Sequence, residues 1–100
     1  MSLLRLSVLF PPGLEEPTTE AISADASMPG FTLLHAEGHS SDFSRASSAE
    51  QVRGRIQRRV LWMVMEADRL DDVLQLLRTH VDCRDVRWWT EPVLAMGRLG

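Results

Sequence analysis

The chain has 100 residues, of which 44% are hydrophobic and 25% are charged, and its formal net charge is −3 at pH 7. This composition is ordinary for one globular domain, and it argues against a disordered chain or a coiled coil. The acidic balance leaves no surplus of basic side chains to displace counterions from a nucleic-acid backbone, so we expect no nucleic-acid partner.

Targeting signals are also missing from the pattern. No run of the sequence approaches the ~20 apolar residues of a membrane span, and the apolar start is interrupted by Arg5 and ends at Pro11 without a signal-peptide cleavage pattern. The single cysteine, Cys83, excludes an internal disulfide and fits a reducing compartment. We therefore expect a cytoplasmic protein with no direct membrane insertion.

The first forty residues predict a strand, a helix and a second strand. Leu3 to Phe10 alternates with a period of two, which is typical of a strand. Leu14 to Ser27 carries a thin apolar stripe at helical spacing, and Pro17 is tolerated in its first turn. Pro29-Gly30 marks a turn, and Phe31 to Glu37 is the second predicted strand.

The next stretch is polar and shows neither the period of a strand nor that of a helix. Gly38 to Ala49 is expected to be a long loop. Capping-box spacing of Ser47 with Glu50, or of Ser48 with Gln51, predicts a single helical turn that runs toward Gly54. Loops of this length in a small domain are usually functional or disordered. We place the loop at residues 38–55.

The second half predicts strand, helix and strand again. Arg59 to Glu66 is apolar on both faces, which favours a central strand or one at an interface. The apolar spacing from Leu70 to Val81, opened by acids, predicts a helix. Val86 to Thr90 is a strand whose adjacent tryptophans point to opposite faces; Pro92 ends it or marks a sheet edge, and Val93 to Leu99 can add a short strand.

This order of elements predicts an α+β fold, the ferredoxin-like split βαβ arrangement (βαββαβ). Its antiparallel sheet would carry two helices on one face, with the long loop between strands two and three. The other face then needs a cover. Strands that are apolar on both sides suggest that the sheets of neighbouring subunits supply it.

The arrangement resembles the PII-like signalling superfamily over nearly the whole chain, taken as a single domain, residues 1–100. The segments that carry the resemblance are 29–32, Gly38-His39, 49–55, Arg58-Arg59-Val60 and 66–71. It is most similar to a subgroup often encoded beside heavy-metal efflux pumps, and its architecture is also similar to the CutA divalent-cation tolerance proteins. The resemblance implies a homotrimer, a regulatory or sensor role and no enzymatic activity.

Departures from the family pattern bear on nucleotide binding. Members that bind ATP are expected to carry Gly-x-Gly-Arg at the loop base, where this chain has Gly38-His39-Ser40-Ser41. The turn between the second helix and the last strand, residues 79–85, also lacks the glycine-rich, lysine-bearing pattern. Phosphate binding by glycine N–H groups is therefore not encoded in the usual way.

Arginines gather where the loop returns to the sheet, at positions 53, 55, 58 and 59. Guanidinium groups match phosphate and carboxylate geometry, so Arg55, Arg58 and Arg59, with Gly38 and His39, form a candidate site for an adenine nucleotide or another anion. The resemblance aligns Arg59 with a basic position near the nucleotide phosphates. The alternative is a solvated face whose arginines pair with Glu50 and other acids.

A pair of histidines and a histidine–cysteine pair raise a metal-binding alternative. His35 and His39 lie near acidic residues at the loop base, and His80 is followed at short spacing by Cys83. Imidazole, carboxylate and thiolate are ligands for zinc or copper. Neither spacing is an established metal signature. The ordinary alternative is hydrogen-bonding loop histidines, a histidine at a helix C-terminus and a small buried cysteine.

The leading hypothesis is a trimeric sensor whose loop, 38–55, becomes ordered when a small effector binds and thereby controls a partner. The family neighbourhood suggests a membrane transporter or its regulator as that partner. The alternative is a direct divalent-metal-binding or metal-tolerance protein, and a third is a purely structural oligomer. No cofactor is certain, and no triad or nucleophile motif supports a catalytic site.

Overall fold

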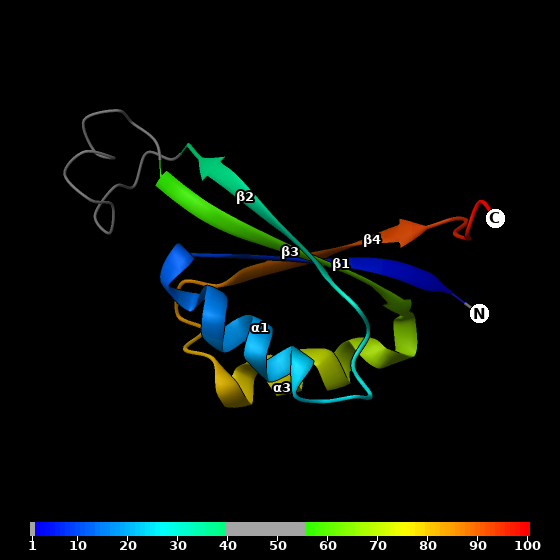
Figure 1. Ribbon diagram of the computed structural model, residues 1–100, viewed down its shortest axis with the longest axis horizontal. Coiled ribbons are helices and arrows are strands. Elements are labelled where there is room, and N and C mark those ends of the chain that lie inside the picture. The colour runs from blue at the N-terminus through cyan, green and yellow to red at the C-terminus, as the bar shows by residue number, and fades with distance from the viewer. Residues whose placement is uncertain (1, 40–55) are drawn as a thin grey trace.

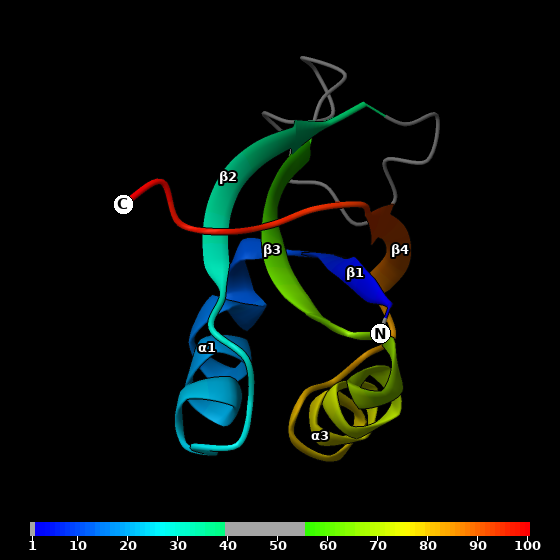
Figure 2. The same ribbon diagram turned by 90° about the vertical axis from the view of Figure 1, so that its right-hand side faces the viewer.

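Four antiparallel strands form one sheet with the order β2-β3-β1-β4 in the computed structural model (Figure 1). The structure describes residues 2–39 and 56–100. The strands are β1 (Leu3–Phe10), β2 (Thr32–Gly38), β3 (Ile56–Glu66) and β4 (Arg87–Val93). Helices α1 (Glu15–Ser23) and α3 (Leu70–His80) both lie on one face of this sheet, side by side (Figure 2). The predicted ferredoxin-like split βαβ fold is confirmed.

Helix α1 is shorter than the predicted 14–27. A single 3₁₀ turn, Pro12–Leu14, precedes it. The helix ends at Ser23 because the Asp25 carboxylate accepts hydrogen bonds from Ser27, from the backbone N at 2.9 Å and from Oγ at 2.6 Å. Such a local turn competes with helical hydrogen bonding. The same two bonds hold the pKa of Asp25 below its ordinary value.

Two strand boundaries also differ from expectation. β3 begins at Ile56 and not at Arg59, because residues 56–58 pair with the end of β2 although the polar side chains of Gln57 and Arg58 break the apolar pattern. β4 continues to Val93 through Pro92, which is tolerated because β4 is an edge strand. Residues 94–99 form no strand, so that prediction is wrong. The helical turn expected at 47–54 lies outside the described residues.

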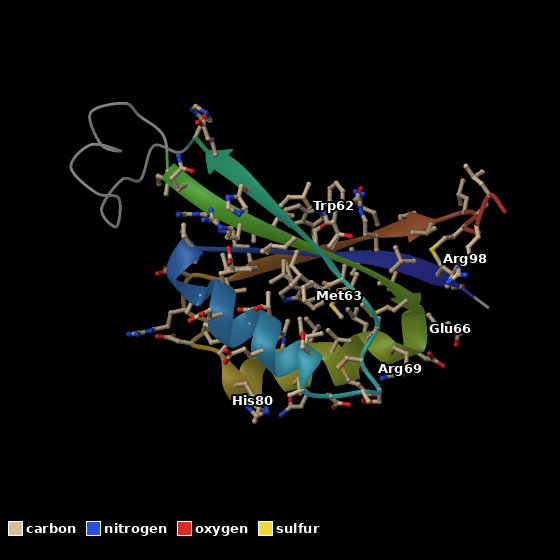
Figure 3. All side chains as sticks on the ribbon, viewed as in Figure 1. Trp62, Met63, Glu66, Arg69, His80 and Arg98 are labelled. Carbon is tan, nitrogen blue, oxygen red and sulfur yellow. The ribbon has the colours of Figure 1, made fainter. Side chains whose placement is uncertain are left out.

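The core lies between the sheet and the helices. Leu6, Val8 and Phe10 alternate along β1 and are fully or almost fully buried, and Leu61 and Met63 lie opposite them on β3. Met65 of β3 is also buried, and the helices contribute Ile22, Val73, Leu74 and Leu77. On β3, Met63 points toward the helices and its neighbour Trp62 points away from them (Figure 3).

The second face of the sheet, here called the open face, carries no helix. Strand alternation and register place on it a largely apolar set of side chains: Leu3, Leu9, Leu34, Ala36, Val60, Trp62, Val64, Trp89 and Val93. Most of these side chains are half-buried, and Trp89 is 44% exposed. An apolar sheet face without a covering layer is the usual sign of an interaction surface.

One ion pair crosses the open face. Nη2 of Arg5 donates to Oε1 of Glu91 at 2.9 Å, and the same guanidinium lies 4.2 Å from the centroid of the Trp62 ring. The hydrogen bond from Arg5 lowers the pKa of Glu91. Both charges on this part of the face therefore have partners within the chain.

Truncation of a buried side chain on the covered face should destabilise the protein. Leu61→Ala removes a fully buried side chain at the centre of β3, so we expect the free energy of unfolding to fall by about 2–5 kcal/mol. Urea denaturation measures this loss. Gln75→Ala, on the exposed side of α3, is the control and should change it by less than about 0.5 kcal/mol. Equal effects would contradict the assigned core.

The Arg5–Glu91 pair predicts a specific pH dependence. Because the folded-state pKa of Glu91 is lowered, its contribution to stability is present above the ordinary glutamate pKa and is lost as the pH falls through the folded value. Glu91→Gln should therefore reduce stability slightly at pH 7 and not at all near pH 2. Urea denaturation at both values checks this. In an Arg5→Gln background the same substitution should have a smaller pH-dependent effect, because Arg5 is the largest cause of the lowered pKa of Glu91.

Candidate functional site

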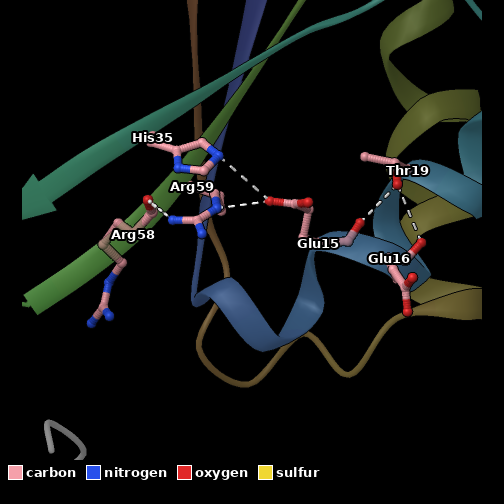
Figure 4. A network of polar contacts seen from close by, with 6 residues as sticks. All are labelled: Glu15, Glu16, Thr19, His35, Arg58 and Arg59. Carbon is pink, nitrogen blue, oxygen red and sulfur yellow. Dashed lines mark hydrogen bonds and ion pairs between the residues drawn. The ribbon is translucent and has the colours of Figure 1, made fainter.

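The end of β2 and the start of β3 form a polar corner beside the start of α1. Cross-strand register places His35 directly opposite Arg59 and Glu37 opposite Gln57. Glu15, the first residue of α1, reaches the same place from the covered side of the sheet (Figure 4). The corner therefore combines residues from three elements that are distant in sequence.

Arg59 is the best-anchored cation of this corner. Its Nε donates to Oε1 of Glu15 at 2.8 Å, and its Nη1 donates to the backbone oxygen of Arg58 at 3.1 Å. The Arg59 side chain is only 16% exposed, against 37% for Glu15. No described residue accepts a hydrogen bond from Nη2 of Arg59. A guanidinium held in this way keeps one donor edge available for a further anion.

Two histidines border the same corner: His35 lies in β2, and His39 is the residue directly after β2. Nε2 of His35 lies 3.9 Å from Oε1 of Glu15, the oxygen that Arg59 also contacts. Nε2 of His39 lies 3.8 Å from Oε2 of Glu37. Both imidazoles are about two-thirds exposed. They can therefore reach a ligand in solution without displacing packed side chains.

The predicted arginine cluster is divided by the sheet. Arg58 and Arg59 are adjacent in β3, so their side chains leave opposite faces. Arg58 lies on the side of the open face, where its Cγ would be 3.5 Å from a Cβ added at Gly38, an ordinary contact distance. Arg55 lies outside the described residues, as does most of the predicted loop. The structure therefore brings His35 and Arg59 together, places His39 beside Glu37 farther along the chain, and puts Arg58 on the other face of the sheet.

The second predicted pair, His80 and Cys83, does not converge on one point. His80 lines a depression with Asp25 and Arg69 between α3 and the connection that follows α1. Cys83 lines a separate depression of about 190 Å³ with Leu77 and Trp88, and its thiol donates to the backbone oxygen of Val81 at 3.3 Å. Within residues 2–39 and 56–100, no group of three or more metal-ligating side chains is arranged to hold an ion.

Glu15 was not identified by the sequence patterns, although it anchors Arg59. The two residues are 44 positions apart, and an acid in the first turn of a helix is explained sufficiently by the helix dipole. Only the packing of α1 against the β2–β3 end of the sheet reveals its second role. One sequence signal could have indicated this role. Glu15 comes just after Pro11-Pro12-Gly13, where the chain reverses and brings the helix back against the sheet.

Loss of the Glu15 carboxylate should reduce the stability of the protein. Glu15→Gln removes the charged acceptor of a largely buried Arg59. We expect stability to fall by roughly 1–2 kcal/mol, the lower part of the range for hydrogen bonds to charged groups, because Glu15 is 37% exposed. Thermal denaturation gives the change. Glu16→Gln is the matched control, because Glu16 is exposed in the same helical turn. An identical, near-zero result for both variants would show that the pair contributes nothing.

Helices in the described residues are too short and too polar to cross a membrane.

None of the curated proteins matches this sequence. A crystal structure of a DUF3240 family protein from Shewanella baltica OS155 has a TM-score of 0.78 and 16% identity, and the match covers 100% of this chain and 99% of that one. A Bacillus cereus protein related to NIF3 matches with a TM-score of 0.67 and 12% identity.

The match to the Bacillus cereus protein covers 97% of this chain but 26% of that protein, so the chain corresponds to about a quarter of its length. At these identities the two structures share the fold and carry no evidence on activity. A family model gives the assignment directly. The model for the protein of unknown function DUF3240 matches residues 1–100, and the chain therefore belongs to the DUF3240 family.

Proposed function

We propose that this protein is a non-catalytic, cytoplasmic sensor of the PII-like kind that binds a small anionic effector at the Arg59 corner. In this proposal it works as a homotrimer and controls a partner protein, of which a heavy-metal efflux transporter or its regulator is the expected class. The observation that carries the proposal is the state of Arg59. Its guanidinium is largely buried, is held by Glu15, and has one nitrogen, Nη2, that no described residue accepts from.

Glu15 supplies the chemical basis for a response to the effector. Its carboxylate accepts a hydrogen bond at one edge of the Arg59 guanidinium. The oxygens of a phosphate or carboxylate ligand would bind a guanidinium edge in the same way. An effector that takes Nη2 adds negative charge beside Glu15 and weakens the Arg59–Glu15 contact. Because Glu15 begins α1, this change alters how α1 is tied to β3. The ligand thereby favours one arrangement of the corner over another.

The two histidines supply selectivity for the ligand. His35 and His39 expose their imidazoles beside Arg59 and Glu37, where they can donate hydrogen bonds to further oxygens of a phosphate chain. The acidic neighbours Glu15 and Glu37 oppose a dense negative charge, so a ligand with spread charge, such as a nucleotide, fits better than a free phosphate ion. Adenine nucleotides are therefore the first effectors to test.

Direct metal binding is the second candidate, and one contact favours it. Nε2 of His39 lies 3.8 Å from Oε2 of Glu37, with His35 on the same strand. A divalent ion held by these groups would need further ligands from another chain or from solvent. The predicted ligands His80 and Cys83 are too far from this group in the fold to be part of the same site.

A thermal-shift panel on the full chain separates these candidates. Adenine nucleotides, phosphate, bicarbonate, zinc, copper and cobalt are added singly. A ligand at 100 times its Kd that binds only the folded state adds about 2.7 kcal/mol, which for a chain of this size raises the Tm by roughly 10 °C or more. We expect this rise with an adenine nucleotide. A rise with metals alone would replace the proposal by the metal alternative.

Variants locate the site. Arg59→Gln should weaken nucleotide binding by about 10–100-fold, since charge-assisted hydrogen bonds contribute about 1.5–3 kcal/mol. Titration calorimetry measures the affinity directly and does not depend on the stability of the variant. Arg78→Gln, which removes an exposed arginine on α3, is the matched control and should bind as the wild type does. Equal affinities for Arg59→Gln and the wild type would contradict the site.

A further inference from the structure

A depression of about 190 Å³ lies between β4 and α3, and it is here called the α3–β4 depression. Its apolar lining side chains are Val8, Leu74, Leu77, Val86 and Trp88. Cys83 and Arg78 complete the lining, so none of the described lining residues is acidic. The depression shares no residue with the Arg59 corner.

The floor of the α3–β4 depression is built from core side chains. Val8, Leu74 and Leu77 are buried and belong to the hydrophobic core between the sheet and the helices. Because close packing fixes the positions of core side chains, the hollow above them exists before a ligand arrives. Sites for small molecules are usually preformed in this way.

Trp88 forms a wall of the depression although its side chain remains in contact with water. The register places it directly opposite Val8, on the covered face of the sheet. It is nevertheless 44% exposed, because β4 is an edge strand and α3 does not cover it completely. A ligand in the depression would bury more of this indole ring. Aromatic rings pack on one another in offset or edge-to-face geometry, so an aromatic ligand suits this wall best.

The side chains inside the depression offer no free polar group. The thiol of Cys83 donates to the backbone oxygens of Val81 at 3.3 Å and of Leu77 at 3.7 Å. Arg78 is exposed, so its charge stays in water. A charged ligand in the hollow would therefore lose its hydration without gaining a partner. An apolar ligand instead displaces water that has few partners there, which increases affinity.

The volume of the depression sets the size of its ligand. An apolar cavity of ~150 Å³ binds one benzene molecule, and the α3–β4 depression is slightly larger. We propose that it binds a small neutral aromatic molecule with a single ring or two fused rings. This second ligand site goes beyond the proposed function, and its failure would leave nucleotide binding at Arg59 untouched.

NMR of the ¹⁵N-labelled full chain, titrated with indole as the probe, tests the proposal. The chain has three tryptophans. Trp88 lines the depression, whereas Trp62 and Trp89 lie on the open face. Single Trp→Phe substitutions assign the three indole N–H signals to their residues.

We expect the Trp88 signal to shift and to saturate, and the Trp62 and Trp89 signals to stay in place. The dissociation constant should be roughly 0.1–1 mM for a ligand of this size. Equal shifts of all three signals would show that indole binds apolar surface without preference, and would overturn the proposal. A Trp88 signal that does not move at the highest soluble indole concentration would also overturn it.

Two valine substitutions in the connection before β4 test the location. Val86→Phe puts a ring into the depression, whereas Val81→Phe enlarges a valine that does not line it. Both valines are half-buried. Val86→Phe should weaken indole binding about 10-fold or more, because a filled site has no room for further atoms. Val81→Phe should change it less than about 2-fold, as expected of a site without contact to the ligand.

Calorimetric titration with indole measures both affinities, and far-UV circular dichroism verifies that each variant is folded. Wild-type affinity in a folded Val86→Phe variant would contradict the assigned site. If that variant does not fold, the shift of the Trp88 signal in the wild-type chain still decides the question.

Discussion

The register of β1 against β3 decides which side chains the helices cover. With Val8 opposite Leu61 and Leu6 opposite Met63, the buried residues of both central strands fall on one face. A shift by one residue would move all of them to the other face and expose them. The helices can cover only this face because both connections, from β1 to β2 and from β3 to β4, pass on the same side of the sheet (Figure 2).

The same alternation divides the chemistry of β3. Arg59 shares the covered face with Leu61, and there it meets Glu15, whereas Arg58 shares the open face with Trp62. Two adjacent arginines thus have different electrostatic surroundings. Arg59 is largely buried and paired, which makes it suitable for a response to ligand. Arg58 lies on the open face.

Much of the fold could be predicted from the sequence because its signals are local. The alternation in Leu3 to Phe10 and the apolar spacing from Leu70 to Val81 correspond to β1 and α3 almost residue for residue. The tryptophan pair predicted side chains on both faces of the last strand, and Trp88 and Trp89 do lie on opposite faces. Errors occurred where a pattern was weak. Residues 56–58 belong to β3 through backbone pairing, which the polar side chains of Gln57 and Arg58 gave no reason to expect.

The candidate site was predictable only in part, because its decisive contacts are not local. The sequence indicated His35, His39 and Arg59 from their place beside the loop, and of these His35 and Arg59 do lie together. It could not indicate Glu15, which reaches Arg59 through the packing of α1 on the sheet. It also grouped Arg58 with Arg59, since clustering along a sequence does not tell which face of a strand a side chain takes.

The account rests most heavily on the difference between the two faces of the sheet. Hydroxyl-radical footprinting of the wild-type chain, read by mass spectrometry at low and high protein concentration, tests it directly. We expect oxidation of Trp62, Trp89 and Met96 to fall as the concentration rises while that of Trp88 stays constant, because a homotrimer that covers the open face would shield only the first three, which lie on that face or just after β4. Oxidation that does not change with concentration at any of the four residues would contradict the account.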